Sequence, residues 1–182
     1  MMKIATTTLL FLCGSSAFAG TEAGILAGYN SLTPSTESGT GDAIGGVGLG
    51  IRGGSRMESG LAIDAQFLRF SASETADFLG TEVTRTLKQM AIGFGSRYYI
   101  GDDSITPFLS AHLNYHLGIQ TKVGSLTVDL ADSSGLGVDA GGGAQIKLTE
   151  GLAVEAFGSF AAQLTGTAKV NALLVGISAC AK

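Results

Sequence analysis

Apolar and polar residues alternate with a period of two along much of this chain, most regularly between residues 87 and 118. In the second half of this stretch one parity holds Leu109, Ala111, Leu113 and Tyr115, and the other holds Ser110, His112, Asn114 and His116. In the first half one parity holds Met90, Ile92, Phe94 and Tyr98, and the other holds Gln89, Gly93, Gly95 and Arg97. Because successive side chains of a β-strand point to opposite faces, the pattern predicts two long strands joined by a tight turn at residues 101–104.

The same alternation, bounded by turn residues and polar segments, predicts eight strands in all. They cover residues 22–32, 43–53, 60–71, 84–101, 104–119, 134–148, 151–162 and 169–179. The connections at 33–42, 72–83 and 120–133 are long and polar, 163–168 is intermediate, and 54–59, 102–103 and 149–150 are short. Long loops at one end and short turns at the other are typical of barrels that span an outer membrane.

The apolar parity of the strands predicts an outer face with aromatic residues near its ends. Toward the long-loop end of the first, third, fifth and seventh strands this parity carries Tyr29, Phe67, Tyr115 and Phe160, and Tyr98 lies toward the opposite end. Aromatic side chains of this kind form girdles at the two membrane interfaces of such barrels. Just beyond the upper ring, on the same parity, follow Arg69, Lys88 and Lys169.

Composition favours a membrane barrel over a soluble one. Charged residues make up 14% of the 182 residues, against roughly 25% in ordinary soluble domains, and no run of about 20 apolar residues could form a membrane helix. The other reading is a soluble barrel or sandwich with its apolar face inward, which would leave the polar parity in water. That parity is instead rich in glycine, which suits a crowded interior better than a solvated surface. We therefore predict an all-β fold, an eight-stranded antiparallel up-and-down transmembrane β-barrel.

The N-terminus has the features of a cleaved export signal. A lysine at position 3 precedes an apolar run too short to span a bilayer, and residues 17–19 read Ala-Phe-Ala. We predict a signal peptide over residues 1–19 and a single barrel domain over residues 20–182. A lipoprotein reading that uses Cys13 is disfavoured because Leu12 precedes it. Without Cys13 only Cys180 remains, so no intramolecular disulfide is expected, and the net charge of −4 argues against nucleic acid as a partner.

These features together resemble the small eight-stranded outer-membrane barrels of the OmpA/OmpX and opacity-protein superfamily. The resemblance rests on the export signal, the alternating strands, the unequal connections and segments such as residues 135–143 and 152–157. It implies an outer-membrane location in a Gram-negative bacterium, export through the periplasm, and outer-membrane lipid, lipopolysaccharide and the barrel-assembly machinery as partners. Members usually end on an aromatic residue, whereas this chain ends on Ala-Cys-Ala-Lys.

Ionisable residues on the inner parity form the main candidate site. They are Arg52, Asp64, Arg97, His112, His116, Asp139, Lys147 and Glu155. Neighbouring strands offer Arg52 with Asp64 and Lys147 with Glu155 as ion pairs, since an unpaired charge inside a narrow barrel costs several kcal/mol. The first interpretation is a structural network that fills the lumen. The second is a narrow polar pore for small solutes, which the many inner glycines would help to open.

Catalysis and metal binding are not expected. His112 and His116 lie four residues apart on a strand, about 13 Å, too far to bind one ion. A lipid A-modifying enzyme built on His112 with Ser110 or Asn114 is the least favoured alternative, because these side chains point away from the lipid. We predict no cofactor and no catalytic residue, and we expect both histidines to form hydrogen bonds in the interior of the barrel.

The expected role is structural, or one of envelope and surface interaction. The long connections are acidic, which indicates either a solvated surface or bridging of divalent cations to lipopolysaccharide. Arg69, Lys88 and Lys169 are candidate contacts to lipopolysaccharide phosphates through charge-assisted hydrogen bonds. The sequence does not identify a surface partner.

Overall fold

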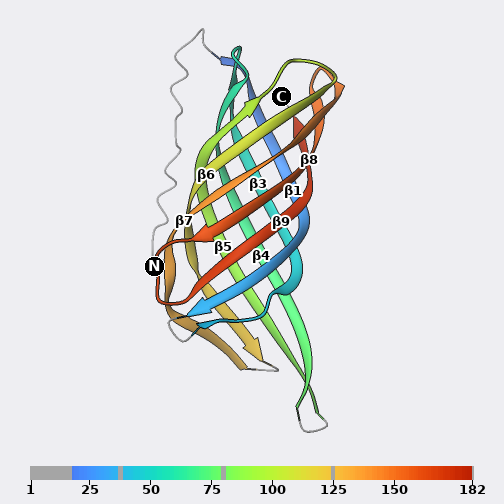
Figure 1. The fold of residues 1–182 in the computed structure, drawn as a ribbon. Coiled ribbons are helices and arrows are strands. Elements are labelled where there is room, and N and C mark those ends of the chain that lie inside the picture. Colours follow the sequence, from blue (N-terminus) through green and yellow to red (C-terminus); the bar gives the residue numbers. More distant parts are fainter. Residues whose placement is uncertain (1–17, 37–38, 79–80, 124–125, 182) are drawn as a thin grey trace, which may run out of the picture.

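A computed structural model describes residues 18–36, 39–78, 81–123 and 126–181, and its regular secondary structure is all β (Figure 1). The strands are β1 (Phe18–Thr36), β2 (Gly39–Thr40), β3 (Ile44–Met57), β4 (Leu61–Phe78), β5 (Thr81–Tyr99), β6 (Ile105–Val123), β7 (Leu126–Thr149), β8 (Leu152–Gln163) and β9 (Lys169–Ala181). Within these ranges no helix has the length and apolar character needed to cross a bilayer. Residues 1–17, which include most of the predicted signal peptide and Cys13, lie outside the described residues, so that peptide stays a prediction.

The strands close into one antiparallel barrel. Each long strand pairs with the next one along the chain, and β9 pairs with β1, while the two-residue β2 only folds back on the end of β1. The predicted eight-stranded antiparallel up-and-down barrel is therefore confirmed.

The stagger of the strands follows from their register. Starting at Glu22 and stepping across paired residues leads through Gly54, Asp64, Gly95, His112, Asp139, Ala161 and Ala172 to Leu32. The circuit returns to β1 ten residues beyond its start (32 − 22 = 10), so the shear of the barrel is ten. An eight-stranded barrel of this kind has strands tilted by roughly 35–45° and an interior just wide enough for side chains. The circuit also places Glu22, Asp64, His112 and Asp139 on one tilted ring around the lumen.

The two parities separate as predicted. On the outer face Ile25 is 68% exposed and Leu109 61% exposed, although both are large apolar side chains. On the inner face Arg97 is 2% exposed and Glu155 is fully buried. This inversion of the usual arrangement, with apolar residues outside and charges inside, is what a barrel surrounded by lipid requires.

Glycine on the inner face gives the lumen side chains their room. A Cβ atom added at Gly48 would come within 2.9 Å of Leu174 Cδ1, and one at Gly141 would lie 2.8 Å from the Cα atom of Ser159 on the next strand. The inner glycines are therefore set by crowding, as the sequence indicated.

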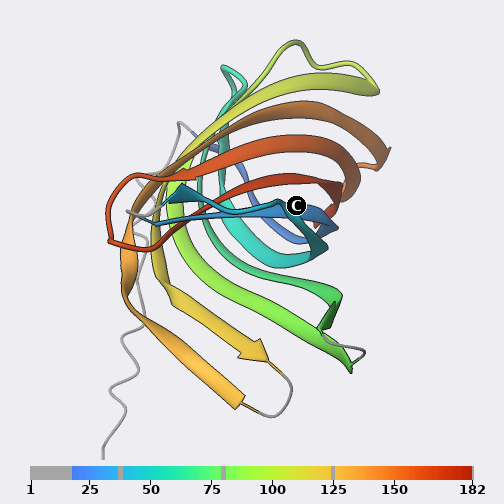
Figure 2. The same ribbon diagram turned by 60° about the horizontal axis from the view of Figure 1, so that its bottom comes forward.

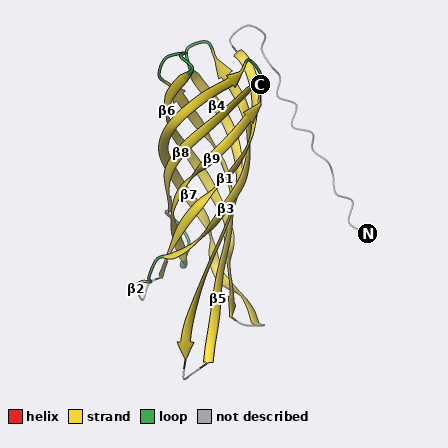
Figure 3. Ribbon diagram, turned by 90° about the vertical axis from the view of Figure 1, so that its right-hand side faces the viewer, coloured by secondary structure: helices red, strands yellow, loops and turns green. Residues whose placement is uncertain are grey.

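Three strand pairs continue past the predicted boundaries. The segments 72–83 and 120–133 were expected to be loops, but β4 stays paired with β5 as far as Phe78 and Thr81, and β6 with β7 as far as Val123 and Leu126. Because β5 and β6 also remain paired up to Arg85 and Val123, the two hairpins form one sheet that projects from the barrel (Figures 1, 2 and 3). The polar composition of residues 72–83 and 120–133 concealed this extension.

Candidate functional site

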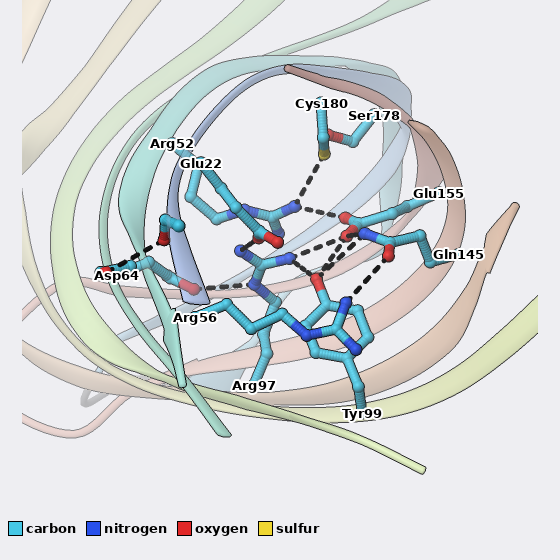
Figure 4. A network of polar contacts seen from close by, with 12 residues as sticks. Glu22, Arg52, Arg56, Asp64, Arg97, Tyr99, Gln145, Glu155, Ser178 and Cys180 are labelled. Carbon is cyan, nitrogen blue, oxygen red and sulfur yellow. Dashed lines mark hydrogen bonds and ion pairs between the residues drawn. The ribbon is translucent and has the colours of Figure 1, made fainter. Parts of the chain in front are cut away.

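The lumen network is a set of ten inward-facing side chains near the short-turn end of the barrel, and Figure 4 labels all of them except His112 and Asp139. Its members are Glu22, Arg52, Arg56, Asp64, Arg97, Tyr99, His112, Asp139, Gln145 and Glu155. They come from seven strands, β1 and β3–β8, because the tilted circuit carries the same parity around the wall. All ten are buried, with exposed fractions of 7% or less.

Arg97 lies at the centre of the network. Its Nε donates to Asp64 Oδ2 at 2.7 Å, and its Nη1 donates to Glu155 Oε1 at 2.7 Å. Its Nη2 donates to Glu22 Oε2 at 3.2 Å. One planar guanidinium thus joins carboxylates from three strands, and its five donors in a rigid fork suit this role better than a lysine would.

Glu155 receives donors from several sides. Arg52 forms an ion pair with its Oε2, while the Tyr99 hydroxyl donates to Oε1 at 2.6 Å and Gln145 Nε2 donates to the same oxygen at 3.1 Å. Arg56 stacks on the Tyr99 ring with 4.0 Å between the guanidinium carbon and the ring centroid. A fully buried carboxylate is stable only with such compensation, so Glu155 is held in one position.

The two histidines have different surroundings. His112 Nε2 lies 2.8 Å from Asp64 Oδ1, and its Nδ1 lies 3.5 Å from Asp139 Oδ1. His116 is 1% exposed, and neither of its ring nitrogens has a hydrogen-bond partner among the described residues. The expectation that both histidines form hydrogen bonds inside the barrel therefore fails for His116.

Both ion pairs expected from neighbouring strands are wrong. Arg52 reaches across the lumen to Glu155, and Asp64 is taken by Arg97. Lys147 lies at the rim, where its Nζ pairs with Asp102 Oδ1 at 2.5 Å. In the sheet register the residue opposite Arg52 is Gln66 and the one opposite Lys147 is Ala153, and in so narrow a barrel a long side chain reaches the far wall as easily as the next strand.

Four network members were missing from the predicted set. They are Glu22, Arg56, Tyr99 and Gln145, and all have the inward parity of their strands. Parity could have identified Tyr99 and Gln145, which share the inward parity of Arg97 and Asp139 on their own strands. Glu22 lies on a strand without a predicted member, and Arg56 lies in the segment 54–59 that was predicted to be a short connection.

Above the network the lumen is filled by further layers. Gln66 Nε2 donates to Asn114 Oδ1 at 3.2 Å, and Gln89 Nε2 donates to Gln163 Oε1 at 3.0 Å. Toward the long hairpins the inner side chains become apolar and buried: Leu32, Ile44, Phe70, Leu87, Ile119 and Val170 belong to one cluster. Between this cluster and the network lies a void of about 20 Å³ lined in part by Leu26, Phe108 and Ser159, which has room for about one water molecule.

At the short-turn end the lumen opens into a vestibule of about 600 Å³, lined by Glu22, Arg56, Glu58, Tyr99, Asp102 and Lys147 among others. Its floor is the lumen network. In the described part of the chain no group of three or more His, Cys, Asp or Glu side chains is placed to hold a metal ion.

The predicted interface residues point outward. Tyr29, Phe67, Tyr98, Tyr115 and Phe160 are between 36% and 62% exposed on the outer face, and their grouping into two membrane girdles stays a prediction. Among the basic residues, Arg69 and Lys88 line one hollow in the barrel wall, and Lys169 lies elsewhere, at the end of β9 beside Ser35.

A closed barrel with apolar residues outside and a compensated charge network inside defines an integral β-barrel membrane protein. The sequence matches the model of the outer membrane protein beta-barrel domain over residues 5–178, and the chain belongs to that family. The protein accordingly lies in the outer membrane of a Gram-negative bacterium. A search of curated protein sequences returns no match.

Solved structures with the same fold are small outer-membrane barrels. Neisserial surface protein A is 16% identical with a TM-score of 0.68, over 90% of this chain and 99% of that one. Ail, the attachment invasion locus protein of Yersinia pestis, was solved with the heparin analogue sucrose octasulfate and is 15% identical with a TM-score of 0.54, over 88% and 98%. OprG of Pseudomonas aeruginosa is 12% identical with a TM-score of 0.52, over 91% and 97%.

Proposed function

We propose that this protein is a non-conducting, non-catalytic outer-membrane barrel that serves envelope integrity and surface interaction. The observation that carries the proposal is the filled lumen, in which charged, polar and apolar layers follow one another from the vestibule to the hairpins. Outer-membrane lipid and lipopolysaccharide surround such a barrel, and the barrel-assembly machinery inserts it.

Two layers oppose a pore. The Arg97–Glu155 contact crosses the lumen at 2.7 Å with both side chains buried, so an ion would have to separate a compensated pair at a cost of several kcal/mol. Beyond it Phe70, Leu87 and Leu32 are each at most 1% exposed. An apolar layer of this kind offers no ligand to a hydrated ion.

The histidines give little support to the enzyme alternative. His112 is 5% exposed and is held between two carboxylates inside the lumen. A lipid substrate approaches from the outer face of the barrel, and the reacting atoms would have to pass through the wall.

The projecting hairpins support a surface role. In the β4–β5 hairpin polar outward side chains form hydrogen bonds between the strands, with Ser73 Oγ 2.9 Å from Thr86 Oγ1 and Thr75 Oγ1 3.1 Å from Thr84 Oγ1. A paired sheet keeps its shape above the membrane and costs a partner less ordering entropy than a loop would. Two of the structural neighbours are a neisserial surface protein and an attachment invasion protein, which accords with this role.

Planar-bilayer recording tests the closed lumen. Purified barrel, shown to be folded by its different gel mobility before and after boiling, is added to a bilayer in high-salt buffer. We expect no unitary current steps, while a porin added afterwards to the same bilayer gives them. Reproducible steps of constant size from the folded barrel would overturn the proposal.

A further inference from the structure

Two irregularities of strand pairing meet at Gly118 in β6. Between β5 and β6 the register shifts so that Met90 faces both Leu117 and Gly118. Between β6 and β7 it shifts again, because Leu117 pairs with Ser134 but Ile119 pairs with Leu130. Gly118 has φ of 104°, a conformation that glycine adopts without strain.

The double irregularity opens a hollow of about 360 Å³ in the wall. Ser133 stabilises the irregular backbone at the hollow, because its hydroxyl accepts a hydrogen bond from the Ile119 N–H at 2.8 Å. Bulges commonly re-aim side chains and create sites in this way. The hollow is a built feature of the sheet and not a gap between loops.

The lining of the hollow combines cations with apolar groups. Arg69 and Lys88 stand on neighbouring strands as a diagonal pair, on the order of 7 Å apart. Within the described residues neither forms an ion pair, unlike Arg85, whose Nη1 lies 3.6 Å from Glu74 Oε1. Met90 and Leu117, 41% and 42% exposed, form the apolar side of the hollow.

Polar groups complete the opposite side. Gln120 and Ser134 are exposed there and can each donate a hydrogen bond, while Asp129 is the one carboxylate among the lining residues whose side chains the structure describes. These described residues supply two cations against one carboxylate, a net charge of about +1, which favours an anion.

The position of the hollow matches the membrane interface. Phe67 and Tyr115 lie on the same outer face, two residues nearer the middle of the barrel than Arg69 and Leu117 respectively. Both are exposed aromatic residues of the predicted girdle. Aromatic side chains of this kind sit at headgroup level. Groups just beyond them meet lipid phosphates. Met90, which pairs with Arg69, and Leu117 lie at this same level and offer the lipid an apolar surface where it passes from the phosphate to the acyl chain.

We infer that this hollow binds the phosphorylated headgroup of an outer-leaflet lipid, with Arg69 and Lys88 on one phosphate and the acyl chain along Met90 and Leu117. Arginine and lysine make short charge-assisted hydrogen bonds to phosphate oxygens. The site needs the barrel to lie in the outer membrane but does not depend on a closed lumen. The lipid site can therefore be disproved while the proposed function stands, and the closed lumen can be disproved while the lipid site stands.

Native mass spectrometry of the membrane-extracted, full-length barrel in detergent tests the site. The probes are bisphosphorylated lipid A, the same lipid after removal of both phosphates, and inorganic phosphate. We expect retention of the phosphorylated lipid only, since both the phosphate and the acyl chain contribute. Equal retention of the dephosphorylated lipid would overturn the inference, and so would inorganic phosphate binding as well as the lipid, which would indicate a site for free phosphate.

Matched charge variants distinguish binding of the lipid in the hollow from a general attraction of the anionic lipid to basic residues on the barrel. The double variant Arg69→Gln/Lys88→Gln should lose roughly tenfold or more in affinity. The control Arg85→Gln/Lys122→Gln removes the same charge at the same end of the barrel, from two residues that do not line the hollow, and it should stay within about twofold. Equal losses in both variants would refute the hollow as the site.

Asp129→Asn tests whether the contact to phosphate is direct. Removing this carboxylate should leave lipid retention unchanged or raise it, because like charges repel. A loss would mean that a divalent cation bridges Asp129 to the phosphate, and the direct contact would be wrong. Unchanged heat-modifiable gel mobility shows that each variant is folded.

Discussion

Replacement of Arg97 by methionine tests whether the lumen network stabilises the barrel. Methionine replaces the aliphatic part of the arginine side chain but removes the guanidinium that contacts Asp64, Glu155 and Glu22 at 2.7, 2.7 and 3.2 Å. Glu155 retains Arg52, and Asp64 retains His112. Glu22, 3% exposed, loses its only ion-pair partner among the described residues.

The expected loss is large because a buried carboxylate is left without compensation. Removing one partner of a buried ion pair costs roughly 3–5 kcal/mol, and we expect Arg97→Met to lower the free energy of unfolding by about that amount. The measurement is equilibrium unfolding in urea in lipid vesicles, with the folded fraction taken from the gel mobility of unboiled samples.

Two further variants make the reasoning refutable. Arg85→Met breaks the Glu74–Arg85 pair, whose side chains are 42% and 40% exposed, and should cost no more than about 1 kcal/mol. Adding Glu22→Gln to Arg97→Met should restore part of the loss, since it removes the uncompensated charge. If Arg97→Met cost as little as Arg85→Met, or Glu22→Gln restored nothing, the network would not stabilise the barrel as argued.

Two other predictions concern crowding and topology. Gly141→Ala should destabilise the barrel by about 1–3 kcal/mol, because the new Cβ would lie 2.8 Å from Ser159 Cα, whereas Gly151→Ala in a turn, where a Cβ meets nothing within 4 Å, should be neutral in the same urea assay. Thr75→Cys on the β4–β5 hairpin should react with a membrane-impermeant maleimide on intact cells, and Asp103→Cys at the short-turn end only after the outer membrane is permeabilised; the reverse would invert the topology. The native Cys180 is 3% exposed and should not interfere.

The projecting sheet shows why some of the fold escaped prediction. Residues 72–83 and 120–133 are polar enough to read as loops, yet β5 and β6 stay paired between Arg85 and Val123 and hold the two hairpins together. Pairing with a neighbouring strand overrides local composition, because the strength of a strand lies largely in its cross-strand contacts.

The sequence by itself determined the strands, their inward and outward faces and the closed barrel, because the period of two is set by each residue's immediate neighbours and lipid outside a barrel demands one apolar face. It also placed Arg52, Asp64, Arg97 and Glu155 inside. Only the tertiary structure decided which of these meet, since a shear of ten brings Glu155 of β8 to Arg97 of β5 across the lumen, away from any sequence neighbour. The hollow at Gly118 likewise depends on two registers shifting at one residue, which a pattern read along a single strand does not contain.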